Sequence, residues 1–552
     1  MKSRLLFAAA FGLFGAFSVH SGALAEQGIV IERAAVEVDP RVFEALDAVS
    51  AQYPLKHAKA LRAFYEARGA ETYWDRGNVS DFIEVIEGSW THALNPFSYH
   101  LDALNRDDLD PMHREVLLSD AYVSYGRDIS GIRVDPRVFK SHRRYWQAPL
   151  SVDALLDHLN RDDDIDDVVA GFTPRGNTYN LLRKELRRLV DEGAPEYEGV
   201  LPIRVKGLLK PGEEHAALAD VRVRLGVRSG SFDAVYDDVL AAAVMRFQEQ
   251  HGLKPDAVIG PGTLRAMNYT HEDRIKQVLA NLERLRWVPE EKPERFIVVN
   301  VPSATLWAID EGRVEIEMPV IVGRKKRPTN IFITDITGVR LNPTWTVPPT
   351  IKREDILPKL VEDPYYLVSK GMELVSAPQK DGDGQVMGAM SVDPASIDWA
   401  VLTDEDLKGM RMVQTPGAHN PLGRVRVLMP NGYNIYLHDT NEKYLFNRAG
   451  RAVSSGCVRL KRPFEIANFI LQEKKDWSQE RLDEILDAGK MRDLYIRETM
   501  PVYLVYYTSW VNEDGRVVYG NDVYGYDKIL IKMLSELDGI FIPVDNNGIY
   551  GG

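Results

Sequence analysis

The chain has 552 residues, of which 45% are hydrophobic and 27% are charged, a composition typical of folded globular domains rather than of disordered chains. This length exceeds what one hydrophobic core normally organises, so we expect three or more domains. The formal net charge of −13 excludes a broad basic surface and therefore argues against a nucleic-acid-binding protein.

The first 25 residues have the pattern of a signal peptide. Two basic residues, Lys2 and Arg4, precede an apolar run over residues 5–17, and Ala23-Leu24-Ala25 has the small-residue pattern of a cleavage site. The run is shorter than the roughly 20 residues that cross a bilayer, so we expect residues 1–25 to be removed on export to the periplasm. An uncleaved inner-membrane anchor is the alternative.

Residues 39–200 are expected to form a helical scaffold domain. Apolar residues recur there at helical spacing, and Pro- and Gly-containing breakers separate the segments. Two aromatic residues, Tyr65 and Trp74, fit core positions better than a sugar-stacking surface. The acidic run over residues 162–167 lacks the glycine and the distal glutamate of a calcium loop, so a solvated helix N-terminus is the better interpretation.

Residues 201–268 are expected to form a small domain of three helices. Helical spacing of apolar residues predicts them, and Asp237-Asp238 stands in the first-turn position before the second helix. The series from Ala243 to Leu264, with His251-Gly252-Leu253 inside it, resembles the peptidoglycan-binding domain type 1. The resemblance implies contact with the cell wall, and a purely structural spacer is an equal alternative.

A helix over residues 270–287 leads into a mainly antiparallel β region that begins near residue 294. Alternating runs predict its first strands over residues 296–301, 305–309 and 314–320. Asp310-Glu311-Gly312-Arg313 is expected to connect the last two of these strands as a hairpin.

The strand spacing stops between about residues 345 and 415, where short helical runs predict an inserted subdomain. Strand pairing is expected to resume at residues 414–423. A helix is expected from Pro463 to Gln472, and residues 511–552 are expected to form C-terminal strands and a tail.

The chain contains a single cysteine, Cys457, which therefore forms no internal disulfide. It follows Ser454-Ser455-Gly456, residues that favour a tight turn with outward-pointing N–H groups. His438, 19 positions earlier, ends an alternating, strand-like run. An imidazole near a thiol can take its proton and activate the sulfur as a nucleophile. Taken separately, a buried structural cysteine and a structural histidine are the alternative interpretations.

Together, His438 and the segment Ser-Ser-Gly-Cys-Val-Arg around Cys457 resemble the active-site signature of the L,D-transpeptidase (YkuD) family. Ser455 stands where many members carry a second histidine, a departure shared with the large periplasmic branch of the family. The resemblance implies a multidomain α+β protein, in which the helical scaffold and the peptidoglycan-binding-like domain precede a mainly-β catalytic domain over residues 294–510. The insertion at about residues 345–415 would be a lid that caps the active site.

The same resemblance implies roles for individual residues. Cys457 would be the nucleophile and His438 its base, and the backbone N–H groups of Gly456 and Cys457 would form the oxyanion hole. Since Asp439 should point to the other face of the strand, we expect a backbone carbonyl, such as that of Ser455, to orient the imidazole.

Four residues near the pair are candidate substrate contacts. Arg459 is expected to bind a substrate carboxylate, with an ion pair to an acidic neighbour as the alternative. Tyr436 shares the strand face of His438 and is either a substrate contact or a packed aromatic. The serines Ser454 and Ser455 complete the candidate substrate site.

The resemblance implies an enzyme that forms 3→3 cross-links in peptidoglycan through a thioester at Cys457, with release of the terminal D-alanine of a tetrapeptide stem. Donor and acceptor stems would be its partners, with other cell-wall synthesis proteins as a further class, and carbapenems would acylate the same cysteine. No cofactor or metal is expected, because the sequence has neither a phosphate-binding glycine loop nor a Cys/His cluster. A hydrolytic cysteine peptidase or amidase of the wall and a non-catalytic wall-binding scaffold are the alternatives.

Overall fold

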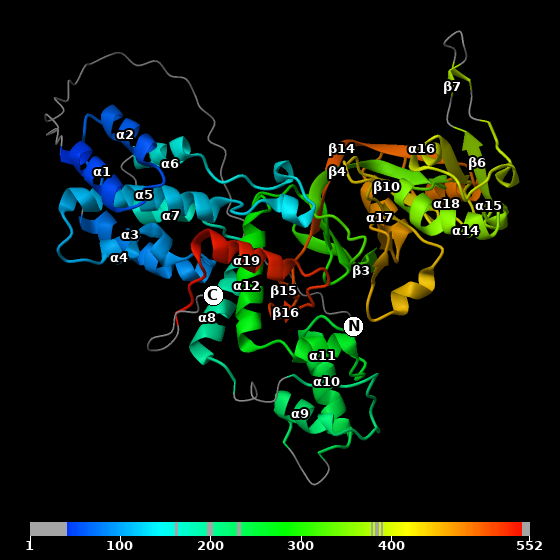
Figure 1. Ribbon diagram of the computed structural model, residues 1–552, viewed down its shortest axis with the longest axis horizontal. Helices are drawn as coiled ribbons and strands as arrows, with labels where there is room; N and C mark the ends of the chain where they lie inside the picture. The colour runs from blue at the N-terminus through cyan, green and yellow to red at the C-terminus, as the bar shows by residue number, and fades with distance from the viewer. Residues whose placement is uncertain are drawn as a thin grey trace.

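The computed structural model describes residues 41–543 except 75, 161–163, 196–201, 229–232, 377–378, 381–385 and 388–389. The expected signal peptide therefore lies outside the described residues. Figure 1 shows a helical N-terminal lobe, a smaller three-helix lobe that projects from the body, and a β-rich lobe that carries a separate, outlying subdomain. Among the described residues, no helix is both long enough and apolar enough to cross a bilayer.

The N-terminal lobe is built around one buried helix, α5 (Pro111–Ser130), which packs against helices on several sides. Asp110 accepts the N–H groups of Met112 and His113, so the Asp-Pro pair starts this helix. The other elements are α1 (Arg41–Gln52), α2 (Ala58–Ala67), α3 (Arg76–Gly88), α4 (Leu101–Leu104), α6 (Val152–Leu159), α7 (Ile165–Phe172) and α8 (Asn177–Glu192), with 3-10 turns at Ser89–His92, Pro96–Tyr99, Pro136–Phe139 and Arg143–Tyr145.

Tyr65 and Trp74, which were predicted to be core residues, both pack in the core of this lobe. Tyr65 is buried and donates to Glu115, and Trp74 donates its indole N–H to Ser119. The described end of the acidic run also agrees with its predicted form, because Asp164 accepts the N–H of Asp166 and caps α7.

The three-helix lobe consists of α9 (Ala217–Arg224), α10 (Asp238–Gln250) and α11 (Pro261–Met267) around its own apolar core. Asp237 caps α10 by accepting the N–H of Leu240. Gln248 is buried and binds the backbone of the following loop, accepting from Asp256 and Ala257. The residues that carry the sequence resemblance in this lobe are thus largely core and loop-bracing residues.

Helix α12 (His271–Arg286) joins the lobes and is buried along most of its length. Its apolar residues divide between two cores: Leu279 and Leu282 belong to the N-terminal core, whereas Ala280 belongs to the core of the β-rich lobe. Near its end, the fully buried carboxylate of Glu283 pairs with Arg286 and accepts the indole N–H of Trp287. Arg286 also donates to the His92 carbonyl of the N-terminal lobe, whereas Trp287 packs in the core of the β-rich lobe, so the end of the helix contacts both lobes.

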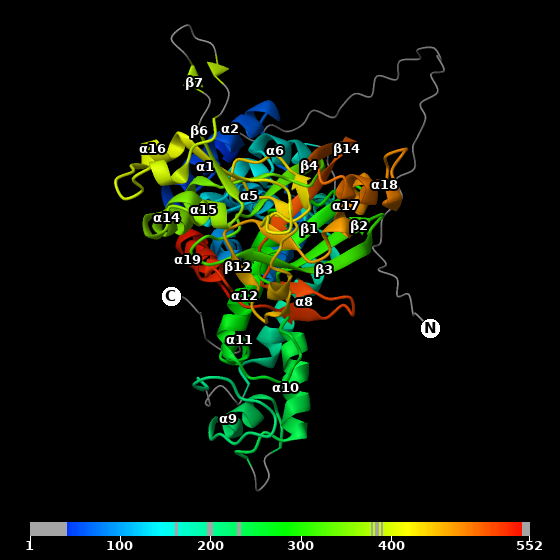
Figure 2. The same cartoon turned by 90° about the vertical axis from the view of Figure 1, so that its right-hand side faces the viewer.

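The β-rich lobe contains one large sheet in the order β12-β3-β13-β11-β10-β4-β14-β1-β2. Because β3 also pairs with β2, the sheet closes on itself around a core of aliphatic side chains. In Figure 2 this lobe faces the viewer, and β1, β2, β3, β4, β12 and β14 are labelled. Its strands are β1 (Arg295–Asn300), β2 (Thr305–Asp310), β3 (Arg313–Gly323), β4 (Phe332–Leu341), β10 (Val425–Leu428), β11 (Leu437–His438), β12 (Ala452–Ser454), β13 (Val458–Leu460) and β14 (Arg492–Val505).

The predicted hairpin between β2 and β3 is present, with positive φ angles at Glu311 and Gly312. The sheet is nevertheless mixed, since β1 with β14, β11 with β13, and β12 with β3 are parallel pairs. Helices α17 (Pro463–Leu471) and α18 (Gln479–Asp487) lie between β13 and β14 in the chain, and α17 packs on β4, β10 and β14.

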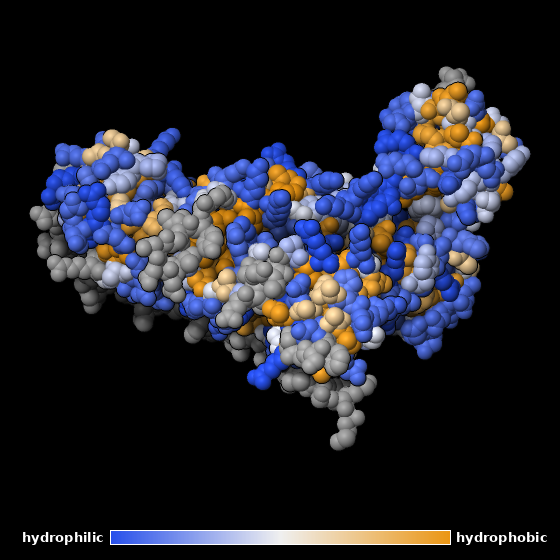
Figure 3. Space-filling model, turned by 60° about the horizontal axis from the view of Figure 1, so that its bottom comes forward, coloured by the Kyte–Doolittle hydropathy of each residue, from blue (hydrophilic) through white to orange (hydrophobic). Residues whose placement is uncertain are grey.

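The insertion between β4 and β10 is a subdomain with its own core, which includes Leu360, Leu374 and Met412. Its elements are β5 (Trp345–Thr346), α13 (Pro349–Ile351), a π-helix at Lys352–Ile356, α14 (Leu357–Glu362), α15 (Tyr366–Ser369), β6 (Met372–Ser376), β7 (Gln379–Lys380), β8 (Val386–Met387), a 3-10 turn at Pro394–Ser396, α16 (Asp404–Lys408) and β9 (Met410–Gln414). Strands β5, β9 and β6 form a separate sheet. Figure 3 shows hydrophobic side chains gathered on the surface of this inserted subdomain.

One sequence prediction about strands is wrong, and another missed a helix. Pairing in the main sheet resumes at Val425, because residues 415–424 form turns after β9. The segment after β14 contains a hairpin of β15 (Ser509–Val511) and β16 (Val517–Tyr519), so strands are present there as predicted, but they are followed by a helix, α19 (Tyr526–Asp538), that was not predicted. Residues 544–552, where the tail was expected to end, lie outside the described residues. Helix α19 packs against α12, which buries Leu530 and Leu534.

Candidate active site

The candidate residues lie on one face of the large sheet, where four adjacent strands are in register. Val458 pairs with Leu437, and both are fully buried on the core face. His438 follows Leu437 on β11 and Cys457 directly precedes Val458 of β13, so both project from the opposite face. The row across the strands is Arg340 of β4, Arg426 of β10, His438 of β11 and Arg459 of β13.

The imidazole of His438 is buried and held in one tautomer. Its Nδ1 contacts the backbone carbonyl of Asp439, and since a carbonyl oxygen only accepts, Nδ1 carries the proton. The other ring nitrogen, Nε2, then keeps its lone pair. A backbone carbonyl thus orients the ring, as predicted, but it belongs to Asp439 and not to Ser455.

The carboxylate of Asp439 points away from the imidazole. It accepts the backbone N–H groups of Arg424 and Thr440 and pairs with Lys443. Gly423 leaves the space for it, because a Cβ at that position would lie 2.3 Å from the carboxylate. This carboxylate therefore supports the loop beside the strand and takes no part in holding the ring.

Burial and nearby cations keep both members of the pair uncharged. Burial lowers the pKa of His438 to about 3, and the positive charges of Arg459 and Arg426 act in the same direction. Burial raises the pKa of the Cys457 thiol, against the opposing influence of the Tyr436 backbone and the two arginines. At neutral pH the resting pair is therefore a thiol and a neutral imidazole. The thiol donates weakly to the carbonyl oxygen of Asn434, 3.7 Å from the sulfur.

The turn before Cys457 is held by hydrogen bonds at its buried side. Ser454 is buried, and its hydroxyl accepts the Gly456 N–H and donates to the Cys457 carbonyl. Gly456 has φ +119°, a conformation that side-chain-bearing residues rarely adopt. Its carbonyl oxygen accepts from the hydroxyl of Thr329, 2.7 Å away.

These contacts change two of the expected roles. Because the Gly456 N–H already donates to Ser454, it is not free to form an oxyanion hole in this conformation. Among the described residues, none accepts a hydrogen bond from the Cys457 N–H, which leaves that group available as the donor. Ser454 forms part of the turn and has no exposed surface for a substrate.

The two arginines beside the pair differ in their partners. Arg459 pairs with Glu442 and lies 3.4 Å from the hydroxyl of Thr440, so its alternative interpretation, an ion pair, is the one that the structure shows. Arg426 stacks its guanidinium 3.6 Å from the ring centroid of Tyr436. Within the described part of the chain, the guanidinium of Arg426 has no ion pair or hydrogen bond, and its buried Nε is unpartnered.

Arg327, which lies between β3 and β4, links the inserted subdomain to the turn before Cys457. Arg327 pairs with Glu354 and Asp355 of this subdomain, and its Nη1 also donates to the hydroxyl of Ser455, 3.2 Å away. Ser455 is exposed beside Cys457. The inserted subdomain is therefore ion-paired to the same loop that binds the turn before Cys457.

Sequence reasoning missed Arg426, Arg327 and Thr329. The segment that contains Arg327 and Thr329 could be recognised as the opening of the β-domain, but its spacing does not reveal contacts across about 130 residues. Arg426 pairs in register with His438, a relation that appears only once the strand order is known. No group of three or more His, Cys, Asp or Glu side chains in the described part of the chain could hold a metal ion.

The neutral resting pair predicts how the thiol reacts with iodoacetamide. Alkylation consumes thiolate, so below the raised pKa of Cys457 its rate should increase about tenfold per pH unit from about pH 6 to pH 9. Because Cys457 is the only cysteine, intact mass reports its modification directly, and Cys457→Ala gives the background. A rate that is constant across this range would reveal a thiolate–imidazolium pair and contradict the electrostatics described above.

Three segments of the chain match known families. Residues 294–502 match the YkuD "L,D-transpeptidase catalytic domain", residues 59–186 match the "Scaffold domain", and residues 223–267 match the "Putative peptidoglycan binding domain". A Haemophilus influenzae protein named "Putative L,D-transpeptidase" is 37% identical over 258 residues, which are 47% of this chain and 49% of that relative. The match thus spans about half the length of the relative.

Solved structures of proteins with the same name were also found. L,D-transpeptidase (Yku) from Stackebrandtia nassauensis is 11% identical over 54% of this chain and 94% of that chain, with a TM-score of 0.18. L,D-transpeptidase 3 from Mycobacterium tuberculosis is 16% identical over 39% of this chain and 61% of that chain, with a TM-score of 0.17. Superpositions this poor add nothing to the assignment, which rests on the sequence matches. By those matches, residues 294–502 are similar to the catalytic domain of the L,D-transpeptidase (YkuD) family, and they follow segments similar to its scaffold and peptidoglycan-binding domains.

Proposed function

We propose that the protein is a periplasmic transpeptidase that forms 3→3 cross-links in peptidoglycan by a thioester mechanism at Cys457. The observation that carries the proposal is that the only cysteine directly precedes β13, the strand paired with the strand of His438, whose neutral imidazole keeps Nε2 as an acceptor. The match to a peptidoglycan-binding domain supports a wall substrate.

The first half of the reaction acylates the sulfur. The Cys457 thiol turns from the Asn434 carbonyl toward His438, whose Nε2 takes the proton as the sulfur attacks the peptide carbonyl after the diamino acid of a tetrapeptide stem. The Cys457 N–H stabilises the oxyanion. The C–N bond to the terminal D-alanine breaks, and His438 returns the proton to the departing amine.

In the second half, the side-chain amine of an acceptor stem attacks the thioester, loses its proton to His438, and releases the thiolate as a thiol. Water competes with the amine for the thioester, so transfer requires a site that excludes it. The lid subdomain, docked through Arg327 beside Cys457, is suited to that task.

The proposal predicts that Cys457→Ala abolishes both product formation and covalent labelling. Purified protein incubated with tetrapeptide muropeptides should give cross-linked dimers and free D-alanine, and Cys457→Ala should lower this rate by more than about a thousandfold. Mass spectrometry of products separates the alternatives. Shortened stems without dimers would identify a hydrolase, whereas no product and no mass added by a carbapenem would leave a non-catalytic wall-binding protein.

We further propose that Arg426, rather than Arg459, binds a carboxylate of the donor stem. Arg459 already has a carboxylate partner in Glu442, whereas the half-buried guanidinium of Arg426 lacks one among the described residues. The ring of Tyr436 supports one face of this guanidinium and leaves its N–H groups to bind an anion. Tyr436 would then position Arg426 in addition to lining the substrate site.

This role predicts that Arg426→Gln raises the KM for the donor by about tenfold to a hundredfold, the loss expected for hydrogen bonds between charged groups. Donors amidated at the terminal carboxylate or at the diamino acid carboxylate identify the group that is bound. Wild-type enzyme should discriminate against one of these donors, and Arg426→Gln should not. Undiminished discrimination in Arg426→Gln, with loss of discrimination in Arg459→Gln, would assign the carboxylate to Arg459 instead.

A further inference from the structure

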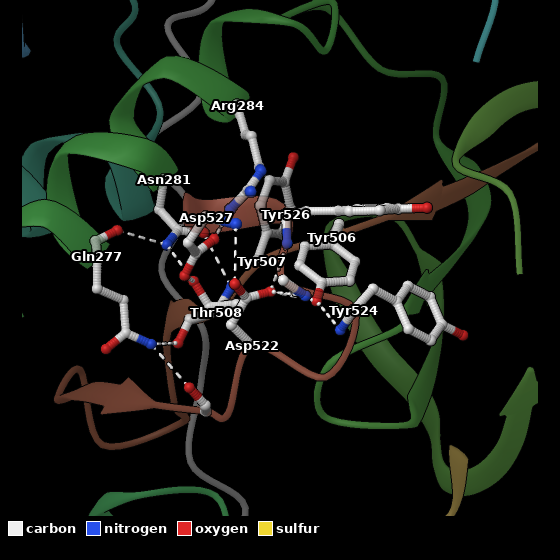
Figure 4. A network of polar contacts seen from close by, with 12 residues as sticks. Gln277, Asn281, Arg284, Tyr506, Tyr507, Thr508, Asp522, Tyr524, Tyr526 and Asp527 are labelled. Carbon is white, nitrogen blue, oxygen red and sulfur yellow. Dashed lines mark hydrogen bonds and ion pairs between the residues drawn. The ribbon is translucent and has the colours of Figure 1, made fainter. Parts of the chain in front are cut away.

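The segment that follows the matched catalytic domain reaches the turn of Cys457 through a chain of buried hydrogen bonds. Figure 4 shows the part of this chain that begins on α12 and ends at Tyr524. Residues 508–527 lie beyond residue 502, where the match to the catalytic domain ends. The chain of hydrogen bonds therefore connects a segment outside the matched catalytic domain to the turn of Cys457.

The first links join α12 to the strand end after β14. Asn281 donates to the hydroxyl of Thr508 and accepts the Thr508 N–H, and Gln277 donates to the Thr508 carbonyl. The Thr508 hydroxyl in turn donates to Asp527, which also pairs with Arg284. These groups are buried, so the bonds are shielded from competing water.

The middle links organise the start of α19. The carboxylate of Asp522 accepts the N–H groups of Gly525, Tyr526 and Asp527. It also accepts the hydroxyl of Tyr506, which is itself the acceptor for the Tyr524 N–H, 2.8 Å away. Tyr524 is thereby fixed at its backbone.

The last links run from Tyr524 to the nucleophile turn. The Tyr524 hydroxyl donates to the Gly323 carbonyl at 2.6 Å and accepts the Thr329 N–H at 3.1 Å. The Thr329 hydroxyl accepts the Gly323 N–H at 2.9 Å and donates to the Gly456 carbonyl at 2.7 Å. There is no space for a side chain at Gly323, where a Cβ would lie 2.3 Å from the Arg327 carbonyl.

The bond to Gly456 sets the direction of the Cys457 N–H. The carbonyl of Gly456 and the N–H of Cys457 belong to one planar peptide unit and point in opposite directions when the bond is trans. Holding the oxygen at Thr329 therefore aims the N–H away from Thr329. Since the Gly456 N–H is occupied by Ser454, the Cys457 N–H is the donor of this turn whose aim matters for the oxyanion.

We propose that Tyr524 and Thr329 are positioning residues for the reaction, which hold the Gly456–Cys457 peptide so that its N–H faces the developing oxyanion. The proposal rests on the proposed function of Cys457 as the nucleophile. It makes residues 508–527 a required support of the active site, although they lie outside the matched catalytic segment. Neither side chain touches the reacting atoms.

The test compares Tyr524→Phe with Tyr526→Phe, in which the removed hydroxyl is buried but has no hydrogen-bond partner in the described structure. A second pair, Thr329→Val and Thr329→Ser, removes or keeps the hydroxyl that binds Gly456. Acylation of Cys457 is followed with p-nitrophenyl acetate, which needs the nucleophile and the oxyanion donor but no wall substrate. Hydrogen exchange of the peptide covering residues 452–460 is followed by mass spectrometry.

Tyr524→Phe should slow acylation about tenfold and Thr329→Val by about a hundredfold, the range seen when an oxyanion donor is disturbed or lost. With muropeptides, kcat should fall and KM stay unchanged. Exchange at residues 452–460 should accelerate in these two variants, whereas Tyr526→Phe and Thr329→Ser should stay near the wild-type values.

Equal acylation and exchange in Tyr524→Phe and Tyr526→Phe, at a temperature where both are folded, would overturn the proposal. The proposed function and the positioning role of Tyr524 and Thr329 can be refuted separately. A wild-type protein that is acylated but makes no cross-links would refute the proposed function and leave the positioning role to the variant comparison. If the wild-type protein is not acylated at all, unchanged exchange in both Tyr524→Phe and Thr329→Val would refute the positioning role on its own.

Discussion

The contact between Nδ1 of His438 and the carbonyl oxygen of Asp439 is the constraint on which the chemistry of this protein depends. A carbonyl only accepts, so the contact places the ring proton on Nδ1 and leaves Nε2 as the basic nitrogen. Burial, Arg459 and Arg426 then keep the ring neutral. A neutral ring cannot stabilise a resting thiolate, so the thiol and the base stay uncharged until a substrate carbonyl arrives. In this respect the site resembles a serine nucleophile with its base more than a preformed thiolate pair.

Three parts of the structure position His438 and Cys457: the large sheet, the loop over residues 323–329, and helix α12 with the C-terminal segment. The sheet register brings His438 beside the strand that follows Cys457, and Arg426 beside His438. The loop from Gly323 to Thr329 binds the Gly456 carbonyl of the turn through the Thr329 hydroxyl. The same loop is ion-paired to the inserted subdomain through Arg327. Helix α12, which belongs to the cores of both the scaffold and the catalytic lobe, supports the C-terminal segment that contacts this loop through Tyr524. Helix α12 and the C-terminal segment therefore link the scaffold core to the loop that binds the turn before Cys457.

Much of this organisation could be predicted from the sequence because it depends on local patterns. Helical and alternating spacing located the scaffold helices, the three-helix lobe and the β2–β3 hairpin, and the lone cysteine with its preceding small residues located the turn. What could not be predicted depends on pairings between distant segments. The parallel contacts of β11 with β13, the partner of Arg459 and the position of Arg426 follow from strand order, which spacing does not encode. Helix α19 was missed because its apolar residues continue a region read as strands, and packing against α12 decides its form.

Nitrogen-15 NMR of the histidine side chains measures the protonation of His438 directly. The chain has 12 histidines, so the signals of His438 are those that disappear in His438→Gln. We expect Nδ1 to carry a proton that exchanges slowly and Nε2 to remain unprotonated at neutral pH and down to about pH 5, well below the ordinary histidine pKa. An Nε2 that is protonated at neutral pH, in either an imidazolium ring or the opposite tautomer, would contradict a neutral base poised to take the proton of Cys457.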